Sequence, residues 1–346
     1  MKACVIHGKH QLGIEEREIP TPSEQEVLVH FGAGGICGSD LHYYNSGRVG
    51  AFVLREAMTL GHEVAGEVVA VGSAVTQVNI GDRVAIHPAR TCGTCRECRS
   101  GRANLCSNVL FYGSAARFPH VQGAFAEYVL ANQTQCINIG AELSFVKAAC
   151  AEPLAVALHA VKRAGDLLGK NVLITGAGPI GLLILMVARS AGAAEIAITD
   201  LLDEPLQVAQ QLGAQKVLNI TQVDENGADG AALQNHFDVA IEASGSLSAL
   251  SFCIGAVVPG GRIVQLGLLP PQCDNNLRLA GLVSREIELV GSFRFDTEFA
   301  SAVRLLSAGR IDPSPLLTAQ IPLADAESAF QLASDRRQAL KVSLIQ

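Results

Sequence analysis

The chain has 346 residues, of which 49% are hydrophobic and 17% are charged, and its net charge is −7 at pH 7. This length suits two domains of ~100–200 residues each, and the apolar content excludes a disordered chain. The acidic balance excludes a protein that binds nucleic acid, because such binding depends on a basic surface.

Two stretches indicate whether the protein is expected to be secreted, inserted in a membrane or cytoplasmic. The opening "MKACVIHGKH" has no apolar core and no small-residue cleavage site, so we expect no secretory signal. The uncharged run at 172–188, "VLITGAGPIGLLILMVA", has Gly-Ala-Gly-Pro in its middle. It therefore predicts a buried strand, a turn and a buried helix, not a membrane span. We expect a soluble, cytoplasmic protein with no membrane partner.

The first 152 residues predict an irregular β domain. Short apolar or alternating runs separated by glycines indicate strands at 26–36, 62–72 and 81–88. Cys37 follows the first of these runs, and His62 and Glu63 begin the second. Thiolate, imidazole and carboxylate form a sound ligand set for a zinc ion with one open position.

A zinc ion of this kind lowers the pKa of a bound alcohol and polarises a carbonyl. Each of the three residues also has an ordinary interpretation. Cys37 suits a buried thiol, His62 a core histidine and Glu63 a surface charge. Their types and positions alone leave both interpretations open.

Four cysteines lie within the polar stretch 90–106, "RTCGTCRECRSGRANLC", in the pattern C-x2-C-x2-C-x7-C. Cytosolic thiols stay reduced, so such a cluster favours a metal site over disulfides. A redox pair would accompany a thioredoxin-like βαβ unit, which this stretch lacks. Four thiolates close the coordination of a tetrahedral zinc, so we predict a structural site at Cys92, Cys95, Cys98 and Cys106.

The remaining cysteines are scattered through apolar or loop segments. We interpret them as packed or incidental thiols: Cys4, Cys136, Cys150, Cys253 and Cys273. Glu152 lies in "CAEPLAVALHA", at 150–160, where the character of the sequence changes. It is a plausible further zinc ligand or the holder of a water molecule.

Beyond Glu152, strands and helices alternate. We expect strands at 171–178, 195–200, 216–220, 237–245 and 261–267, and helices at 179–192, 204–213 and 247–257. Alternation of this kind predicts βαβ units and a doubly wound parallel sheet, so the fold class is α/β. After a strand at 285–293 and a helix at 297–309, the tail returns to mixed character. We therefore predict one domain from 1–152 and 296–346, and an inserted domain from 153–295.

A glycine motif marks the first predicted turn of the inserted domain. Gly176, Gly178 and Gly181 follow a strand and open a helix in the pattern G-x-G-x-x-G. The first glycine allows a tight turn, the second lets the backbone approach a pyrophosphate, and the third lets helix and strand pack closely. Asp200 ends the next strand, 19 residues after Gly181, where a carboxylate accepts from a ribose hydroxyl. The motif therefore predicts a dinucleotide cofactor.

Asp200 also predicts which cofactor is used. A carboxylate at this position repels a 2′-phosphate, and the following residues, "LLDEP", contain no arginine that would hold one. We therefore expect NAD to be preferred over NADP.

These segments together resemble the zinc-dependent medium-chain alcohol dehydrogenases, in the sorbitol and polyol branch. The likeness covers essentially the whole chain and rests on "GGICGSDLHYY", "GHEVAGEV", the four-cysteine stretch, "EPLAVALHA", "GAGPIG" and "GSFRF", in that order. The resemblance implies a GroES-like irregular β catalytic domain and a Rossmann domain. Within the branch, "FYGSAARFPHVQGAFAEY" is most similar to L-idonate 5-dehydrogenases, which interconvert L-idonate and 5-dehydro-D-gluconate.

The resemblance also implies roles for individual residues. It implies two zinc ions per chain: a catalytic ion at Cys37, His62 and Glu63, with Glu152 bound directly or through water, and a structural ion at the four cysteines. Ser39 and His42 would relay a proton from the alcohol to solvent. NAD contacts would come from Ile180, Asp200, Leu266, Gly267, Leu268, Ser292, Phe293 and Arg294. The substrate pocket would include Tyr43, Glu152 and Arg294.

Arg117 and His120 lie in the segment most similar to the idonate enzymes, so we expect them to bind the substrate carboxylate or to be solvated loop residues. Two positions depart from the polyol branch. Pro205 replaces an arginine near the adenosine, and Phe295 replaces a tyrosine whose hydroxyl would bond a polyol.

The leading prediction is a zinc- and NAD-dependent oxidation of a secondary alcohol of a sugar acid, in a homodimer or homotetramer. The alternatives are a sorbitol or other polyol dehydrogenase, a more distant threonine dehydrogenase, and a non-catalytic protein that binds NAD or zinc. A non-catalytic protein would have a broken ligand set, yet Cys37, His62, Glu63 and Ser39 are all present.

Overall fold

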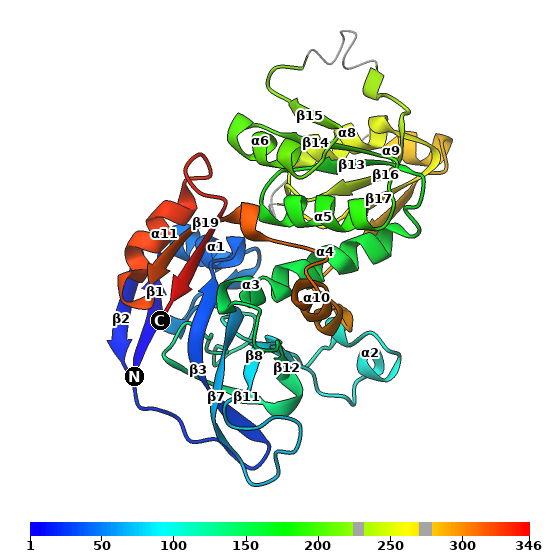
Figure 1. Cartoon of the computed structure of the whole chain (residues 1–346). Coiled ribbons are helices and arrows are strands. Elements are labelled where there is room, and N and C mark those ends of the chain that lie inside the picture. Colours follow the sequence, from blue (N-terminus) through cyan, green and yellow to red (C-terminus); the bar gives the residue numbers. More distant parts are fainter. Residues whose placement is uncertain (224–231, 270–278) are drawn as a thin grey trace. The chain divides into compact units, whose positions relative to one another are not determined.

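The computed structural model describes residues 1–223, 232–269 and 279–346. These residues form two compact units, one from Met1–Glu152 with Asp296–Gln346 and the other from Pro153–Phe295 (Figure 1). The helix α4, Ala151–Ala164, spans the point at which the chain passes from the first unit into the second. Cys273 and the rest of 224–231 and 270–278 lie outside the described residues.

The first unit is built on a seven-stranded sheet in which β3 is central. The strand order is β12-β8-β7-β3-β20-β19, and β11 also pairs with β3. β3 runs antiparallel to both β7 and β20, so it connects the N-terminal and C-terminal parts of the chain. The strands are β3 Glu26–Gly35, β7 Glu63–Val71, β8 Arg83–Ile86, β11 Tyr128–Asn132, β12 Cys136–Asn138, β19 Leu317–Pro322 and β20 Lys341–Ile345.

Smaller sheets and short helices surround this sheet. The small sheets are β2-β1-β6, β10-β9 and β4-β5. Their strands are β1 Lys2–Gly8, β2 Gln11–Glu16, β4 Arg48–Val49, β5 Phe52–Val53, β6 Met58–Thr59, β9 Ala89–Arg90 and β10 Leu110–Phe111. The helices are α1 Gly38–Ser46, α2 Arg96–Arg99, α3 Phe145–Ala149, α10 Glu298–Ser307 and α11 Ala326–Ser334. Short 3-10 helices cover Ala103–Leu105, Gln133–Gln135, Ser314–Leu316 and Leu323–Asp325.

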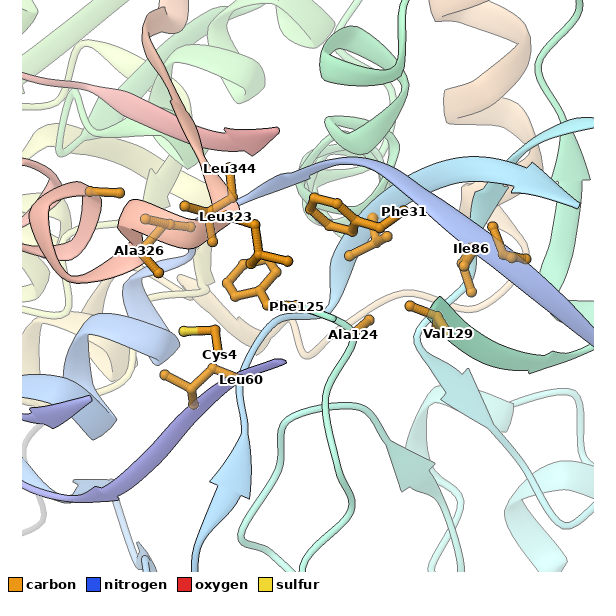
Figure 2. Close-up of a cluster of buried hydrophobic side chains, with 14 of the residues drawn as sticks. Cys4, Phe31, Leu60, Ile86, Ala124, Phe125, Val129, Leu323, Ala326 and Leu344 are labelled. Atoms are coloured by element: carbon orange, nitrogen blue, oxygen red, sulfur yellow. The ribbon is translucent and has the colours of Figure 1, made fainter. Parts of the chain in front are cut away.

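The core of the first unit joins segments from both ends of the chain. Figure 2 shows Cys4 and Phe31 from the N-terminal part beside Leu323 and Leu344 from the C-terminal part, with Phe125 among them. All five side chains are buried. Burying apolar area from both ends makes the first unit depend on the residues that follow the insertion.

The second unit is a six-stranded parallel sheet in the order β15-β14-β13-β16-β17-β18. Numbered along the chain, this order is 3-2-1-4-5-6, the doubly wound arrangement that binds dinucleotides where the order reverses, between β13 and β16. The strands are β13 Asn171–Thr175, β14 Glu195–Asp200, β15 Lys216–Asn219, β16 Phe237–Glu242, β17 Val257–Gln265 and β18 Glu288–Gly291. Within the described residues its helices are α5 Pro179–Ser190, α6 Asp203–Gln211, α8 Leu247–Ala256 and α9 Leu279–Ser284.

The expected fold class, an irregular β unit with a doubly wound parallel sheet, is confirmed. The largest local difference is at β17, which begins at Val257 and not at Gly261, because the chain extends directly from the end of α8. The uncharged run at 172–188 forms β13, a turn and α5, as predicted. Across the ranges that the structure describes, we find no helix with the length and apolarity needed to cross a membrane.

Candidate active site

Three potential metal ligands converge in the first unit. Cys37 directly precedes α1, His62 directly precedes β7, and Glu63 is the first residue of β7. The neighbouring strands β3 and β7 place Gly35 opposite Glu63, so both ligand-bearing segments leave the sheet at the same place. One ligand atom from each of the three side chains lies within 4.8 Å of the others.

The burial of these groups fits a metal ion. His62 is 5% exposed and Glu63 is 0% exposed. Nδ1 of His62 and Oε1 of Glu63 are buried and have no hydrogen-bond partner. Burying polar atoms without partners is unfavourable, so an ion that coordinates these side chains removes part of the cost. A sulfur, a nitrogen and an oxygen ligand suit zinc with one open position.

Asp40, which was not predicted from the sequence, holds the two ligand-bearing segments together. Its Oδ2 accepts from the backbone N–H of Cys37 at 3.0 Å, and its Oδ1 accepts from the backbone N–H of Gly61 at 3.2 Å. Oδ1 also lies 3.7 Å from Nδ1 of His62. The signal that would have found it is an acidic residue three positions after Cys37, at the start of a helix.

Charged groups around the three ligands shift one another's protonation. Burial raises the pKa of Glu152 to about 8, opposed by His62 and reinforced by Glu63 and Cys37. Burial also raises the pKa of the Cys37 thiol to about 12, and the charge of Glu63 adds to that rise. Lys341 Nζ pairs with Oε2 of Glu63 at 2.5 Å. Although burial opposes its charge, the neighbouring carboxylate leaves the pKa of Lys341 raised. Lys341 was also missed.

The residues expected to handle the proton lie on α1. The hydroxyl of Ser39 hydrogen-bonds with the thiol of Cys37, and His42 is exposed. Tyr43 is only 3% exposed, and its hydroxyl accepts from the backbone N–H of Ala115 at 2.9 Å. The helix therefore places the hydroxyl of Ser39 beside the ligand Cys37 and the imidazole of His42 in solvent. Tyr43 links α1 to the segment around residue 115.

Arg117 and His120 have different surroundings. Nη2 of Arg117 donates to Oδ1 of Asn108 at 3.1 Å, beside the four-cysteine stretch. His120 is 6% exposed. Its Nε2 accepts from the backbone N–H of Arg55 at 2.9 Å, and its Nδ1 contacts the carbonyl of Arg117 at 2.7 Å. Backbone groups contact both ring nitrogens of His120, which leaves neither nitrogen open to a substrate carboxylate.

The four cysteines at 92–106 form a second cluster, with one sulfur atom from each lying within 4.8 Å of the others. Sγ of Cys106 lies 3.5 Å from Sγ of Cys92 and 3.9 Å from Sγ of Cys95. These distances are far longer than the ~2.05 Å of a disulfide bond. A tetrahedral ion with Zn–S bonds of ~2.3 Å places its sulfurs at this kind of separation.

Backbone amides point at the sulfurs of this cluster. The N–H of Cys95 donates to Cys92, and that of Cys98 donates to Cys95, at 3.3 and 3.5 Å. Hydrogen bonds from Thr94 lower the pKa of Cys92 to about 5, whereas burial raises that of Cys98 to about 12. A bound cation would remove this difference between the two thiols, because it favours the thiolate form of all four residues. The described cysteines outside both ligand clusters, Cys4, Cys136, Cys150 and Cys253, are buried.

The glycine motif in the second unit has the backbone geometry of a phosphate-binding turn. Gly176 has φ +94°, which favours glycine, and Gly178 is the N-cap of α5. A Cβ on Gly181 would lie 1.8 Å from the carbonyl oxygen of Gly176, so only glycine lets α5 start this close to β13. Ile180 lies half-buried in the first turn of α5. The amide groups of this helix terminus suit an anion such as a pyrophosphate.

Asp200 ends β14 and is 6% exposed. Its Oδ2 accepts from the backbone N–H of Ala177 at 2.7 Å, within the glycine motif. Its Oδ1 accepts from the N–H groups of Leu201 and Leu202 at 2.7 and 3.2 Å. Asp200 therefore links the end of its strand to the phosphate-binding turn. Pro205 is buried in the first turn of α6.

The other expected cofactor residues lie at the carboxyl ends of β17 and β18. The N–H groups of Leu266 and Gly267 donate to the carbonyl of Glu242, while Leu268 and Phe293 are exposed. Ser292 is buried, and its Oγ has no hydrogen-bond partner. The Arg294 guanidinium lies 4.8 Å from the ring centre of Phe293.

Glu242, at the end of β16, was not predicted from the sequence to take part in the candidate cofactor site of the second unit. It is 0% exposed and accepts from the N–H groups of Ser244 and Gly245 at 2.7 and 3.0 Å and from Nε2 of Gln265 at 2.6 Å. A buried carboxylate at the end of a central strand therefore organises the turns beside the point where the strand order reverses.

Two family models match the chain. The alcohol dehydrogenase GroES-like domain matches residues 23–141, and the zinc-binding dehydrogenase model matches residues 179–308. The chain is 40% identical to an L-idonate 5-dehydrogenase (NAD(P)(+)) of Escherichia coli K12 over 99% of this chain and 98% of the relative. It is 37% identical to a sorbitol dehydrogenase of Bacillus subtilis 168, over 99% and 96%.

Solved structures agree with these matches. The crystal structure of the E. coli L-idonate 5-dehydrogenase superposes with a TM-score of 0.94 at 39% identity, covering 100% of this chain and 98% of that one. A putative zinc-binding dehydrogenase of Sinorhizobium meliloti 1021, bound to NADP, superposes with a TM-score of 0.90 at 31% identity, covering 100% and 99%.

Proposed function

Because the chain belongs to the zinc-dependent medium-chain alcohol dehydrogenase family, we propose that it oxidises a secondary alcohol of a sugar acid, with NAD as its preferred cofactor. The proposed reaction is the reversible conversion of L-idonate to 5-dehydro-D-gluconate. The observation that carries the chemistry is the convergence of Cys37, His62 and Glu63, with Nδ1 of His62 and Oε1 of Glu63 buried and without hydrogen-bond partners. The similarity to an L-idonate 5-dehydrogenase supports this substrate.

The chain's own residues would hold both reacting partners. Cys37, His62 and Glu63 would bind a zinc ion, which as a Lewis acid lowers the pKa of an alcohol, while NAD supplies the hydride acceptor. Glu152, which is buried and interacts electrostatically with His62, Glu63 and Cys37, would be a further ligand or hold a water molecule. Asp40 would keep the segments of Cys37 and His62 at a fixed separation.

Ser39 would receive the proton of the substrate alcohol. Its hydroxyl interacts with the Cys37 thiol and favours the thiolate form of that ligand. His42, three residues along the same helix, is exposed and would pass the proton to solvent. A positioned proton acceptor of this kind contributes ~10²–10⁴-fold to rate.

Two features favour a sugar acid over a plain polyol. Phe295 is buried and has no hydroxyl with which to bond a polyol. Arg117 lies in the 111–128 segment and offers a guanidinium for a carboxylate, provided that it leaves Asn108. Arginine pairs well with a carboxylate because the bond is charge-assisted and can be bidentate.

The four cysteines at 92–106 would bind the second, structural zinc.

Sorbitol or another polyol is the second candidate substrate. It is favoured by the 37% identity to a sorbitol dehydrogenase. The preference for NAD over NADP is also proposed here, because the similar proteins do not share one cofactor. One relative is named for both NAD and NADP, and one solved neighbour holds NADP.

Initial rates with L-idonate, D-sorbitol, D-xylitol and L-threonine, each with NAD and NADP, test the proposal. We expect the highest kcat/KM for L-idonate with NAD. Arg117→Ala should raise KM for L-idonate about 10- to 100-fold, as expected for losing a charge-assisted hydrogen bond, and should leave sorbitol turnover nearly unchanged. Arg102→Ala is the control, because its Nε bonds only locally to Ser100 in the four-cysteine stretch.

A higher kcat/KM for sorbitol in the wild type would contradict the sugar-acid proposal. Equal losses for both substrates in Arg117→Ala would make Arg117 a structural residue. We further propose a cytoplasmic enzyme that assembles as a homodimer or homotetramer and has no nucleic-acid partner, in keeping with its net charge of −7. Light scattering of the purified protein checks the assembly.

A further inference from the structure

A buried lysine reaches the candidate metal ligands from the C-terminal strand. Lys341 is the first residue of β20, 278 positions after Glu63, and is 4% exposed. Its Nζ pairs with Oε2 of Glu63 at 2.5 Å and donates to the carbonyl of Ile36 at 2.9 Å. One ammonium group therefore contacts a ligand carboxylate and the peptide that directly precedes Cys37.

The sheet leaves a passage for this side chain. β20 and β7 lie on opposite sides of β3, so they are separated by two strand spacings, ~10 Å in all. The side chain crosses β3 at Gly35. A Cβ on Gly35 would lie 2.3 Å from Oε2 of Glu63 and 2.8 Å from Cε of Lys341. The missing side chain at residue 35 is therefore what allows the buried ion pair.

We propose that Lys341 is a positioning residue that competes with the catalytic zinc for the carboxylate of Glu63. This inference rests on the proposed zinc site. Without metal, the ammonium compensates a carboxylate that is 0% exposed. With metal bound, the ammonium still neutralises part of the negative charge of Glu63. Glu63 therefore binds the zinc ion more weakly, and is displaced more readily, than a buried carboxylate without such a partner. Through Ile36, the ammonium also holds the segment of Cys37.

Both members of the Lys341–Glu63 ion pair are buried. Removing one partner of a buried ion pair leaves the other charge uncompensated, which is strongly unfavourable. Lys341 is the cation that pairs with Glu63 among the described residues, so in a Lys341→Met protein the zinc ion would have to compensate this carboxylate. The substitution should therefore destabilise the metal-free protein more than the loaded protein, and it should strengthen the bond between Glu63 and the metal.

Release of zinc to the chelator 4-(2-pyridylazo)resorcinol tests this proposal. The Cys37→Ser protein, which would retain only the structural ion, identifies the phase that belongs to the four-cysteine site. We expect Lys341→Met to slow release of the catalytic zinc at least about tenfold, equivalent to about 1.4 kcal/mol. The rise in Tm on zinc loading should be larger than in the wild type. Lys216→Met, which removes the half-exposed partner of Glu195 in the second unit, should change neither quantity.

Three further proteins make the test specific. Lys341→Gln keeps a donor for the carbonyl of Ile36 but loses the charge, so it should also release zinc slowly; it replaces Lys341→Met if that protein does not fold. Lys341→Arg keeps the charge and should release zinc as the wild type does. In a Glu63→Gln background, Lys341→Met should no longer slow release, because the competition for a carboxylate has been removed.

Unchanged or faster release in both neutral variants overturns the proposal, as does equal slowing in the Glu63→Gln background. These outcomes differ from a failure of the proposed function. A wild-type protein that binds one zinc ion per chain, or that oxidises no alcohol, contradicts the zinc-dependent reaction itself. Two ions per chain with normal turnover, together with unchanged release in the variants, contradicts only the role of Lys341.

Discussion

Asp200 faces the glycine motif with both carboxylate oxygens engaged by backbone amides. A ribose hydroxyl can donate a hydrogen bond to this carboxylate, whereas a 2′-phosphate is repelled by its negative charge. Asp200→Ala should therefore lower kcat/KM for NAD by about 10- to 100-fold, through the loss of a charged hydrogen bond, and should relax discrimination against NADP. Initial rates at varied cofactor concentration measure both effects.

Asp203→Ala is the matched control for that change. Asp203 is exposed in the first turn of α6, and its carboxylate bonds to Asn219 and not to the glycine motif. The ratio of kcat/KM values for NAD and NADP should stay the same in this protein. If the wild type used NADP as well as NAD, the cofactor argument from Asp200 would fail.

The hydroxyl of Ser39 interacts with the thiol of the proposed zinc ligand Cys37. If this hydroxyl receives the alcohol proton, Ser39→Ala should lower kcat at least about tenfold, because proton transfer then lacks a positioned acceptor. Zinc content should remain at the wild-type value, since alanine removes no ligand. Steady-state kinetics and metal analysis of the same preparation provide the measurement.

Ser46→Ala is the control, because Ser46 is exposed at the other end of α1. It should leave kcat unchanged. Normal turnover by Ser39→Ala would remove Ser39 from the proton path.

At the scale of elements, the four-cysteine segment contains little regular structure of its own. Its helix α2 covers only Arg96–Arg99, and none of the residues in that helix is buried. A segment with so little apolar burial needs another source of order, and four thiolates around one ion supply it. We therefore treat the structural zinc as the centre of this segment.

Cys98→Ser should remove this ion and lower Tm by roughly 5 °C or more, because structural zinc contributes directly to folding free energy. Metal analysis should find one ion per chain in place of two. Cys136→Ser, which alters a buried thiol outside both clusters, should retain two. Full thermal stability with loss of turnover alone in Cys98→Ser would reverse the roles of the two sites.

At the scale of the whole molecule, the stability of the protein without catalytic zinc should depend on pH through Glu152. Burial raises the pKa of this carboxyl from 4.5 to about 8 in the folded protein. Between these values the folded protein keeps a proton that the unfolded chain has lost. The free energy of unfolding should therefore fall as the pH rises through this window, by up to about 1.4 kcal/mol per pH unit.

Denaturation of the chelator-treated protein at pH 5 and pH 8 measures this dependence. Glu152→Gln has no proton to lose and should show a smaller decrease in stability between the two pH values. Zinc loading should also reduce the decrease, because the cation favours the ionised carboxylate. An identical decrease in wild type and Glu152→Gln would show that other groups are responsible.

Features with a local physical cause were predictable from the sequence. The glycines at 176, 178 and 181 follow an apolar strand and precede an apolar helix, so they predicted the turn between β13 and α5. Alternation of strands and helices predicted the parallel sheet, and the confirmed fold class follows from it. The four cysteines lie within one short segment, so chain connectivity alone brings their sulfurs close together.

The candidate catalytic site depended on tertiary structure, because its members come from separate strands. Cys37 and Glu63 meet because β3 and β7 pair in a register that places Gly35 opposite Glu63. Lys341 joins them because β20 adds to the other side of β3, a pairing formed by residues that follow the inserted unit. Hydrophobic periodicity predicts that a segment is a strand, but it does not state which strand will be its neighbour. Local sequence patterns therefore predict the elements and the four-cysteine zinc segment, whereas the packing of distant strands sets which charged side chains share the buried site.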